Sequence, residues 1–213
     1  MGKADYAKKP DVYFTGERGD YVAQLPPNAH VLEIGCASGN TGAAALAAGA
    51  ASYRAVELEG AAAARAAQHL TEVIVGDVET LGLPWPPHSF DVLIASEVLE
   101  HLVDPWSVLR KIKPLLKPGG LVFASSPNVA NWRILRMQLA GDWRRDPEGP
   151  MDATHLRWFT PKTYAQMFND CGYVVDSIEP ITPLSRKQRV FAQLTRSPYL
   201  FWVQTNLRAH VPV

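Results

Sequence analysis

Cysteine is scarce in this sequence. Cys36 and Cys171 are the only two among 213 residues, and they lie far apart. Small secreted domains that depend on disulfides carry many cysteines at short spacings, so the sequence excludes a disulfide-rich scaffold. We expect two reduced thiols in a reducing compartment, and the cytoplasm is the predicted location.

Long apolar runs are also missing. No uninterrupted apolar stretch approaches the roughly 20 residues that cross a bilayer as a helix. The first residues, Met1–Asp5, lack the apolar core of a secretory signal peptide. The sequence therefore predicts neither a transmembrane segment nor a secretory leader.

An excess of one charge is the third absence. Lysine and arginine together number 21, as do aspartate and glutamate, so the formal net charge is zero. Proteins that hold nucleic acid by its phosphates usually carry a basic excess, so no nucleic-acid partner is expected. Hydrophobic residues are abundant at 47%, which is enough to build the core of one domain over residues 1–213.

Apolar runs and helical patterns alternate along the chain, which is typical of a parallel sheet covered by helices on both faces. Strands are predicted at about 30–35, 53–57, 72–76, 90–96, 120–125 and 173–179. Helices are predicted at about 12–25, 40–49, 60–69, 105–116 and 161–170. Asp104 and Pro105 are suited to begin the fourth of these helices, and Gly119–Gly120 to end it. The expected fold is a doubly wound, Rossmann-like α/β domain.

A glycine-rich turn directly follows the first predicted strand. Val31–Ile34 leads into Gly35 and Gly39, and an alanine-rich helical segment follows. Glycines let the backbone turn sharply and approach a ligand, while the free N–H groups of the helix favour an anionic group. Three further signals follow: Glu57 at the end of the second strand, Gly76–Asp77 after the third, and Phe90–Asp91 at the start of the fourth.

This order of motifs over residues 12–180 resembles the class I S-adenosylmethionine-dependent methyltransferases, in their methyltransferase type 11/23 branch. The resemblance rests on Glu33–Gly39, Glu57, Gly76–Glu79, Phe90–Leu102 and Leu116–Gly120. It implies a seven-stranded, mostly parallel sheet and S-adenosylmethionine as the cofactor. Ala37 stands where the family usually has glycine, and we expect the turn to survive because alanine is small.

The resemblance also implies a set of cofactor-binding residues. Glu57, at a strand end about twenty residues beyond the glycine turn, is placed to accept both ribose hydroxyls, unless it is only a solvated carboxylate. Asp77 and the Val78 backbone should meet the adenine, unless Asp77 only forms a turn. Glu33 is expected to be buried and to support the loop, or to be purely structural. The full predicted set is Glu33, Gly35, Cys36, Gly39, Glu57, Leu58, Asp77, Val78 and Ser96.

Residues 126–160 interrupt the alternation with an insertion rich in tryptophan and arginine. It leaves the carboxyl end of a predicted strand, where ligands bind in such sheets, and is therefore the predicted substrate lid. A neutral imidazole can take the proton of a hydroxyl acceptor, and His155 is the first candidate base and His101 the second. Arg157 could bind an anionic group of the acceptor, or could pair with Asp152 only to hold the lid.

A magnesium site is a further hypothesis. If residues 97–101 are helical, Glu97, Glu100 and His101 share one face, and His155 could be a fourth ligand. The pattern resembles the Glu-x-x-Glu-His arrangement of certain magnesium-dependent O-methyltransferases. Metal-free relatives use a similar Glu-His pair for packing, so this alternative stays open.

Other functions remain as alternatives. Gly35-x-x-x-Gly39-x-x-Gly42 superficially matches the loop of NAD(P)-dependent oxidoreductases, but no tyrosine here has the lysine four positions later that these enzymes need. A non-catalytic nucleotide-binding module would not need Glu97, His101 and His155. The favoured function is O-methylation of a small-molecule or glycan-type acceptor, with N-methylation the nearest alternative. The tail at 185–213 is expected to complete the sheet, although a homodimer contact or contact with a membrane-bound acceptor remains possible.

Overall fold

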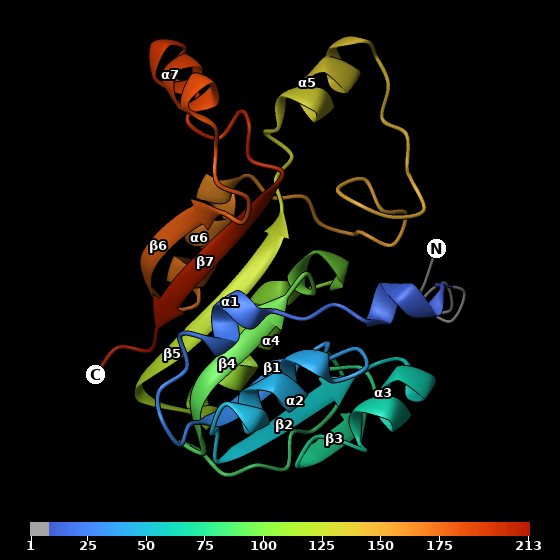
Figure 1. Ribbon diagram of the computed structural model, residues 1–213, viewed down its shortest axis with the longest axis vertical. Coiled ribbons are helices and arrows are strands. Elements are labelled where there is room, and N and C mark those ends of the chain that lie inside the picture. The colour runs from blue at the N-terminus through green and yellow to red at the C-terminus, as the bar shows by residue number, and fades with distance from the viewer. Residues whose placement is uncertain (1–8) are drawn as a thin grey trace.

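Seven strands form one sheet in the order β3-β2-β1-β4-β5-β7-β6 in the computed structural model, which describes residues 9–213 (Figure 1). β1 to β5 run parallel to one another, and β7 runs antiparallel to both β5 and β6. This confirms the predicted Rossmann-like α/β fold. The strands are β1 (His30–Ile34), β2 (Ser52–Glu57), β3 (Glu72–Val75), β4 (Phe90–Ser96), β5 (Leu116–Pro127), β6 (Val174–Pro180) and β7 (Gln204–His210).

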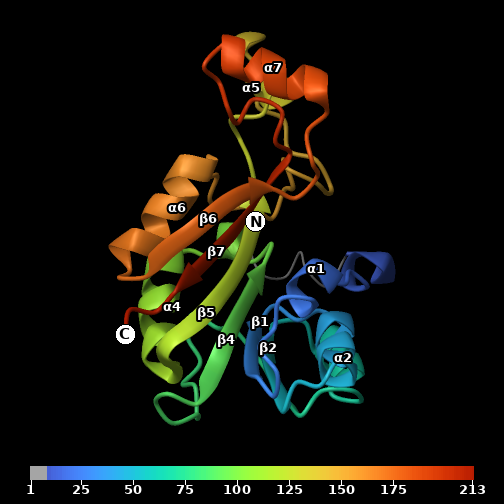
Figure 2. The same ribbon diagram turned by 60° about the vertical axis from the view of Figure 1, so that its left-hand side comes forward.

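Helices cover the two faces of the sheet in separate layers (Figure 2). One layer holds α1 (Gly19–Val22), α2 (Asn40–Ala47) and α3 (Gly60–Ala66), whose buried residues Tyr21, Ala45 and Ala66 join one apolar cluster with β1 and β2. The other layer holds α4 (Pro105–Ile112) and α6 (Pro161–Asp170). Three short 3-10 helices connect these elements, η2 (Asp11–Phe14), η3 (Leu99–His101) and η4 (Lys113–Leu115).

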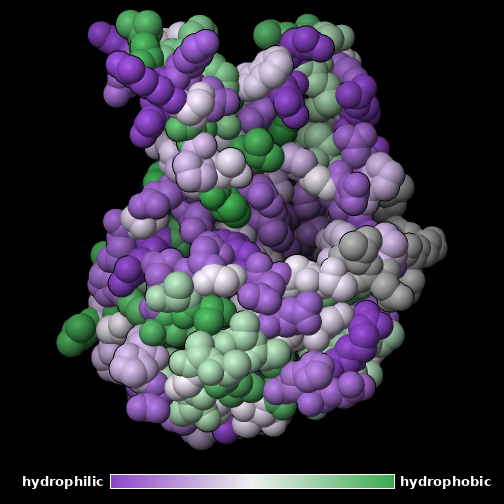
Figure 3. Space-filling model, viewed as in Figure 1, coloured by the Kyte–Doolittle hydropathy of each residue, from purple (hydrophilic) through white to green (hydrophobic). Residues whose placement is uncertain are grey.

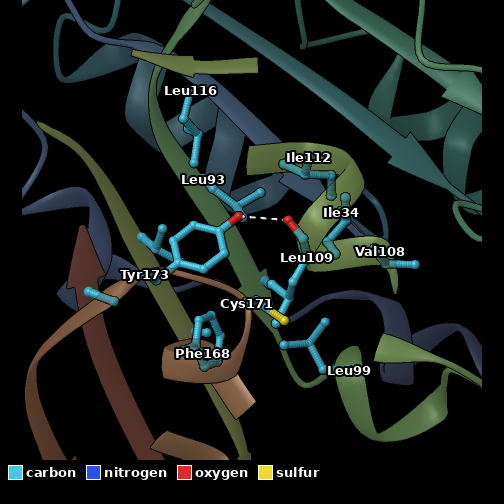
Figure 4. Close-up of a cluster of buried hydrophobic side chains, with 14 of the residues drawn as sticks. Ile34, Leu93, Leu99, Val108, Leu109, Ile112, Leu116, Phe168, Cys171 and Tyr173 are labelled. Carbon is cyan, nitrogen blue, oxygen red and sulfur yellow. Dashed lines mark hydrogen bonds between the residues drawn. The ribbon is translucent and has the colours of Figure 1, made fainter. Parts of the chain in front are cut away.

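The core between the sheet and the second helix layer is aromatic and aliphatic (Figure 4). Leu93 from β4, Leu109 from α4 and Phe168 from α6 are fully buried there. The one polar atom that Figure 4 shows bonded in this cluster is the Tyr173 hydroxyl, which donates to the Leu109 carbonyl at 2.9 Å. A buried hydroxyl that has a partner avoids a desolvation cost of about 1–3 kcal/mol. Cys36 and Cys171 are free and buried, as the sequence predicts.

Two predicted helices differ from the structure. The helix predicted at 12–25 is replaced by η2 and α1, and residues 15–18, which include Gly16, separate these two short segments. The helix predicted at 105–116 ends at Ile112, because Pro114 lacks the backbone N–H that a continued helix would use. Its predicted start is confirmed, since the Asp104 side chain accepts from the Ser107 N–H. Gly119–Gly120 lie within β5 rather than at a helix end.

The C-terminal tail completes the sheet, as predicted. β7 inserts between β5 and β6, so the last strand in sequence is not the edge strand. The chain reaches it through α7 (Arg186–Leu194), and a second helix, α5 (Trp132–Leu139), follows β5. Figure 1 shows α5 and α7 projecting from the same end of the molecule, beyond the carboxyl end of β5.

Among residues 9–213, no helix has both the length and the apolarity needed to cross a membrane. The predicted absence of a leader concerns Met1–Asp5, which lie outside the described residues.

Candidate active site

A cavity of about 610 Å³ lies where the parallel strands end. Ile34 pairs with Val56 in the register of β1 and β2, and the Gly35 N–H donates to the Val56 carbonyl at 2.8 Å. The loops that follow β1, β2, β3 and β4 therefore open at one edge of the sheet, and Figure 3 shows the surface hollowed below the two projecting helices. Of the nine residues predicted to bind the cofactor, eight line the cavity: Glu33, Gly35, Cys36, Glu57, Leu58, Asp77, Val78 and Ser96.

The glycine turn has the conformation that its sequence predicts. Gly35 has φ of +70°, and a Cβ there would lie 2.3 Å from a methyl carbon of Val98. Ala37 adopts φ of +50°, so the turn survives although alanine replaces the usual glycine. Gly39, the ninth predicted residue, does not line the cavity. It begins α2 with φ of +83° and lets the turn pack against Ala66 of α3, where a Cβ would be 2.9 Å away.

Glu57 is held at the end of β2 by backbone donors. Its carboxylate accepts from the N–H of Ala37 at 2.8 Å and from the N–H of Glu59 at 2.9 Å. The side chain is buried, and this burial raises the pKa of Glu57 while the backbone N–H groups oppose the shift. The glycine turn and the Glu57 carboxylate are thus one hydrogen-bonded unit, which fixes an acceptor group at the cavity wall.

Glu33 is a buried carboxyl group inside the sheet. The Tyr53 hydroxyl donates to its Oε2 at 2.8 Å. Burial raises the pKa of Glu33 to about 8, the neighbouring Glu57 adds to this shift, and the hydrogen bond from Tyr53 opposes it. Glu33 is therefore mostly protonated at neutral pH, which removes the cost of burying a charge.

Replacing Glu33 with glutamine is expected to stabilise the folded protein at alkaline pH. Between about pH 4.5 and 8 the unfolded chain has lost the Glu33 proton and the folded chain has kept it, so wild-type stability falls as pH rises through this window. Glutamine has no proton to lose, so its free energy of unfolding lacks this pH dependence. From pH 5 to pH 9, the difference in the free energy of unfolding between the variant and wild type should shift in favour of the variant by on the order of a few kcal/mol. Urea unfolding at both pH values measures this. Glu148→Gln, at an exposed site, is the matched control. The same difference in the free energy of unfolding between Glu33→Gln and wild type at both pH values would contradict a protonated Glu33.

The loop after β3 is stiffened by contacts from within and from α4. The Asp77 carboxylate accepts from the Glu79 N–H at 3.0 Å, and Val78 is buried. The Lys111 ammonium of α4 donates to the carbonyls of Val78 and Leu81 at 2.7 and 2.6 Å. The wall of the cavity at Asp77 is therefore anchored to the second helix layer.

Sequence reasoning did not identify Arg18, which lines the cavity next to Ser96. The Arg18 guanidinium donates to the hydroxyls of Ser96 and Ser125 at 2.7 and 2.9 Å and pairs with Asp20. It also lies over the Tyr21 ring. The segment Gly16–Gly19 was expected to be helical, and no spacing in the sequence indicates that its arginine reaches the ends of β4 and β5. Gln204, from the start of β7, is a second cavity residue that was missed.

His101 and His155 come together at the cavity, although they lie on η3 and on the insertion. Their ring centroids are 4.6 Å apart. His155 Nδ1 donates to the Pro150 carbonyl at 3.2 Å, so in the neutral ring Nε2 is the acceptor. Burial lowers the pKa of His155, and burial together with His155 lowers the pKa of His101 to about 3. Both imidazoles are therefore uncharged at neutral pH.

The proposed alignment of Glu97, Glu100 and His101 on one helical face is wrong. Glu97 has φ of +54° and lies before η3, so the segment makes no continuous helix. Glu97 instead accepts from the Gln204 side chain at 2.9 Å. Glu100, His101 and His155 do come together, with one potential ligand atom from each within 4.8 Å of the others. Glu100 is almost fully buried, neither of its carboxylate oxygens has a hydrogen-bond partner among residues 9–213, and burial raises its pKa strongly.

The insertion at residues 126–160 is held at the cavity by an ion pair from Asp152 to Lys9, and not by the Asp152–Arg157 pair considered from the sequence. Asp152 pairs with Lys9, and the Arg157 guanidinium donates to the Val103 carbonyl. Asp152 also accepts from the Thr154 hydroxyl, which is 3.1 Å from His101 Nδ1. Asp152 and His155 thus both line the cavity, and the ion pair between Asp152 and Lys9 connects the insertion to the N-terminal segment.

Similar proteins are known by sequence and by structure. The chain is 28% identical over 160 residues to a ubiquinone biosynthesis O-methyltransferase of Neisseria meningitidis, covering 71% of this chain and 66% of the relative. It is 37% identical over 133 residues to the protein of the same name in Xanthomonas campestris, covering 59% of this chain and 55% of the relative. The chain thus spans roughly half to two thirds of these curated relatives.

Among solved structures, a SAM-dependent methyltransferase from Methanosarcina mazei has the same fold, with a TM-score of 0.67 and 18% identity. The similarity covers 91% of this chain and 97% of that one. The family model described as a methyltransferase domain matches residues 12–178, which is most of the chain. These residues contain the glycine turn, Glu57, Asp77 and the histidine pair. The chain belongs to the methyltransferase domain family.

Proposed function

We propose that this protein transfers a methyl group from S-adenosylmethionine to an oxygen of a small-molecule or glycan-type acceptor. The observation that carries the proposal is the shared cavity. It is lined by the strand-end carboxylates Glu57 and Asp77 and by the neutral imidazoles of His101 and His155. The names of the curated relatives support oxygen as the methylated atom.

The donor set of the cavity fits the cofactor. Glu57 offers a fixed carboxylate to the ribose hydroxyls, and Asp77 offers one to the adenine amino group. Arg18 lines the same cavity, where its guanidinium is already paired with Asp20 and positions the Ser96 hydroxyl. When bound, the cofactor supplies a methyl group on a positively charged sulfur. The remaining tasks of the protein are to hold the acceptor in line, to exclude water and to take a proton.

His155 is proposed as the group that takes the acceptor proton. It is uncharged at neutral pH, and the hydrogen bond from Nδ1 to Pro150 leaves Nε2 as the basic atom. His101 is the second candidate, because its pKa near 3 makes it a weak base. A neutral amine acceptor already has a lone pair, so N-methylation would depend less on either ring.

A divalent-cation site is a second proposal, and it rests on Glu100. Two carboxylate oxygens without partners are costly to bury unless a proton or a cation neutralises them. The two imidazoles next to Glu100 complete a group of nitrogen and oxygen donors. Such a mixed set suits Mg²⁺ less than Mn²⁺ or Zn²⁺, because Mg²⁺ prefers oxygen ligands.

Calorimetric titration is expected to separate these proposals. S-adenosylmethionine and S-adenosylhomocysteine should bind with micromolar dissociation constants, and NAD and NADP should not bind. Mg²⁺, Mn²⁺ and Zn²⁺ are titrated separately, against wild type and Glu100→Gln. Cation binding that Glu100→Gln abolishes would support the metal site, whereas no cation binding would reject it. A preference for the dinucleotides would reject the methyltransferase proposal.

A further inference from the structure

Helix α5 exposes an apolar stripe on its outer face. Trp132, Leu135 and Leu139 are spaced so that they share one face of the helix, and Leu139 is 90% exposed. Ile134, the buried residue of α5, faces the other way toward the protein. The stripe therefore points away from the body of the molecule.

Helix α7 repeats this arrangement. Val190, Phe191 and Leu194 are exposed on neighbouring positions of one face, and Leu194 is 80% exposed. Ala192 is the buried residue of α7 and lies on the opposite side. In Figure 3, apolar and polar side chains are mixed over both projecting parts of the surface. Two helices at one end of the molecule thus present apolar side chains that the described residues do not cover.

These apolar stripes are surrounded by positive charge. Residues 131–145 and 185–203 contain eight lysines and arginines and one acidic residue, Asp142, although the whole chain has 21 of each kind. Within the described residues, six of these cations are exposed and form no ion pair: Arg133, Arg136, Arg186, Lys187, Arg189 and Arg196. Although the net charge of the chain is zero, its charges are unevenly distributed, and the end that carries α5 and α7 is basic.

The two helices are joined at their bases, close to the cavity. The Trp132 N–H donates to the Leu200 carbonyl at 2.8 Å, and the side chain of Asn131 donates to the Trp202 carbonyl at 2.9 Å. Pro127, the last residue of β5, and Val203, the residue before β7, both line the cavity. The basic, apolar end of the molecule thus adjoins the cavity rim.

We propose that α5 and α7 form a docking surface for an anionic lipid bilayer. Exposed leucine and aromatic side chains enter the boundary between headgroups and acyl chains, and the flanking lysines and arginines are attracted to anionic headgroups. A second copy of this chain is a poorer partner, because a symmetric contact through these faces would bring like charges together. Nucleic acid would match the cations but would leave Leu139 and Leu194 exposed. The docking surface does not depend on the proposed methyl transfer.

Sedimentation of the full chain with vesicles tests the proposal. One vesicle is pure phosphatidylcholine, and the other contains roughly a third phosphatidylglycerol. We expect binding to the anionic vesicle to be at least about tenfold tighter, and to weaken at high salt. Equal binding to both vesicles, or no binding to either, would overturn the proposal.

Two double variants divide the surface into its charged and apolar parts. Arg136→Gln with Arg189→Gln should weaken binding about thirtyfold, at roughly fivefold for each lost charge. Leu139→Ser with Leu194→Ser should weaken it at least about tenfold. Val75→Ser on β3 and Arg110→Gln on α4 are matched exposed controls that should bind like wild type.

Further measurements on the same variants test two alternative partners for this surface, a second copy of the chain and nucleic acid. If the leucine pair converts a dimer to a monomer in light scattering and wild type does not bind vesicles, the face joins two copies of the chain. If a mixed-sequence RNA binds more tightly than the anionic vesicle, the partner is nucleic acid; either result overturns the proposal. All variants should keep wild-type affinity for S-adenosylmethionine, so a failed docking surface is distinguishable from a failed cofactor site.

Discussion

Glu57→Ala is expected to weaken S-adenosylmethionine binding by about two to four orders of magnitude. A carboxylate that accepts from two hydroxyl groups contributes about 1.5–3 kcal/mol for each hydrogen bond, and every 1.4 kcal/mol is a factor of ten in affinity. The variant also leaves the N–H groups of Ala37 and Glu59 without the Glu57 acceptor, so the glycine turn loses the hydrogen bonds that hold it to the end of β2. Calorimetric titration of both proteins measures the loss.

Glu57→Gln removes the negative charge but keeps one of the two hydrogen bonds that hold the glycine turn. Glutamine keeps the length of the side chain and one carbonyl oxygen, but it cannot accept two hydroxyls and two N–H groups as a carboxylate does. We expect an affinity and a thermal midpoint between those of wild type and Glu57→Ala, because the glutamine NH2 replaces one of the two oxygens that accept from the Ala37 and Glu59 N–H groups. Unchanged cofactor affinity in Glu57→Ala, in a protein that circular dichroism shows to be folded, would contradict the assigned role.

His155→Ala is expected to slow methyl transfer by about 10² to 10⁴ while leaving cofactor affinity unchanged, since general-base catalysis is typically worth that much. The assay is single-turnover transfer from labelled S-adenosylmethionine to an acceptor found in a screen of hydroxylated compounds. His101→Ala should have a smaller effect, because the pKa of His101 is near 3.

The pH dependence of His155→Ala identifies the step that is lost. The pKa of His155 lies below its ordinary value of 6.5, so the wild-type rate should be flat at neutral pH and fall only in more acidic solution. The variant has no base, and its rate should rise with pH as the acceptor hydroxyl itself ionises. A full rate in His155→Ala would indicate an acceptor that needs no base, such as a neutral amine. Lost cation binding together with lost rate would instead indicate a metal ligand.

The carboxylate-lined side of the cavity could be predicted because its signals are local. Gly35, Glu57 and Asp77 each follow a strand directly, and the register of parallel strands brings strand ends to one edge of the sheet. Gly39 does not line the cavity, because a glycine in such a turn can serve either a ligand or the packing of two helices. Only the position of Ala66, a residue of another helix, shows which of these applies.

The side of the cavity near the insertion could be predicted less well, because its contacts join distant segments. Glu97 and Glu100 were expected on one helical face, but the positive φ of Glu97 turns the chain before η3 begins. Arg18 reaches Ser125 and Lys9 reaches Asp152 through contacts that no spacing rule describes. The insertion has no regular apolar period along most of its length, so its path over the cavity is not encoded in a local pattern.

The sequence by itself determined the alternating α/β fold, the glycine turn and the carboxylates at the strand ends, because periodicity and backbone conformation are local properties. Only the tertiary structure decided that His155 meets His101, that Glu100 is buried without a partner and that α5 and α7 share one basic end. Each of these depends on how residues far apart in the chain pack together. Such packing is set by the burial of the whole core, and not by the residues that it brings into contact.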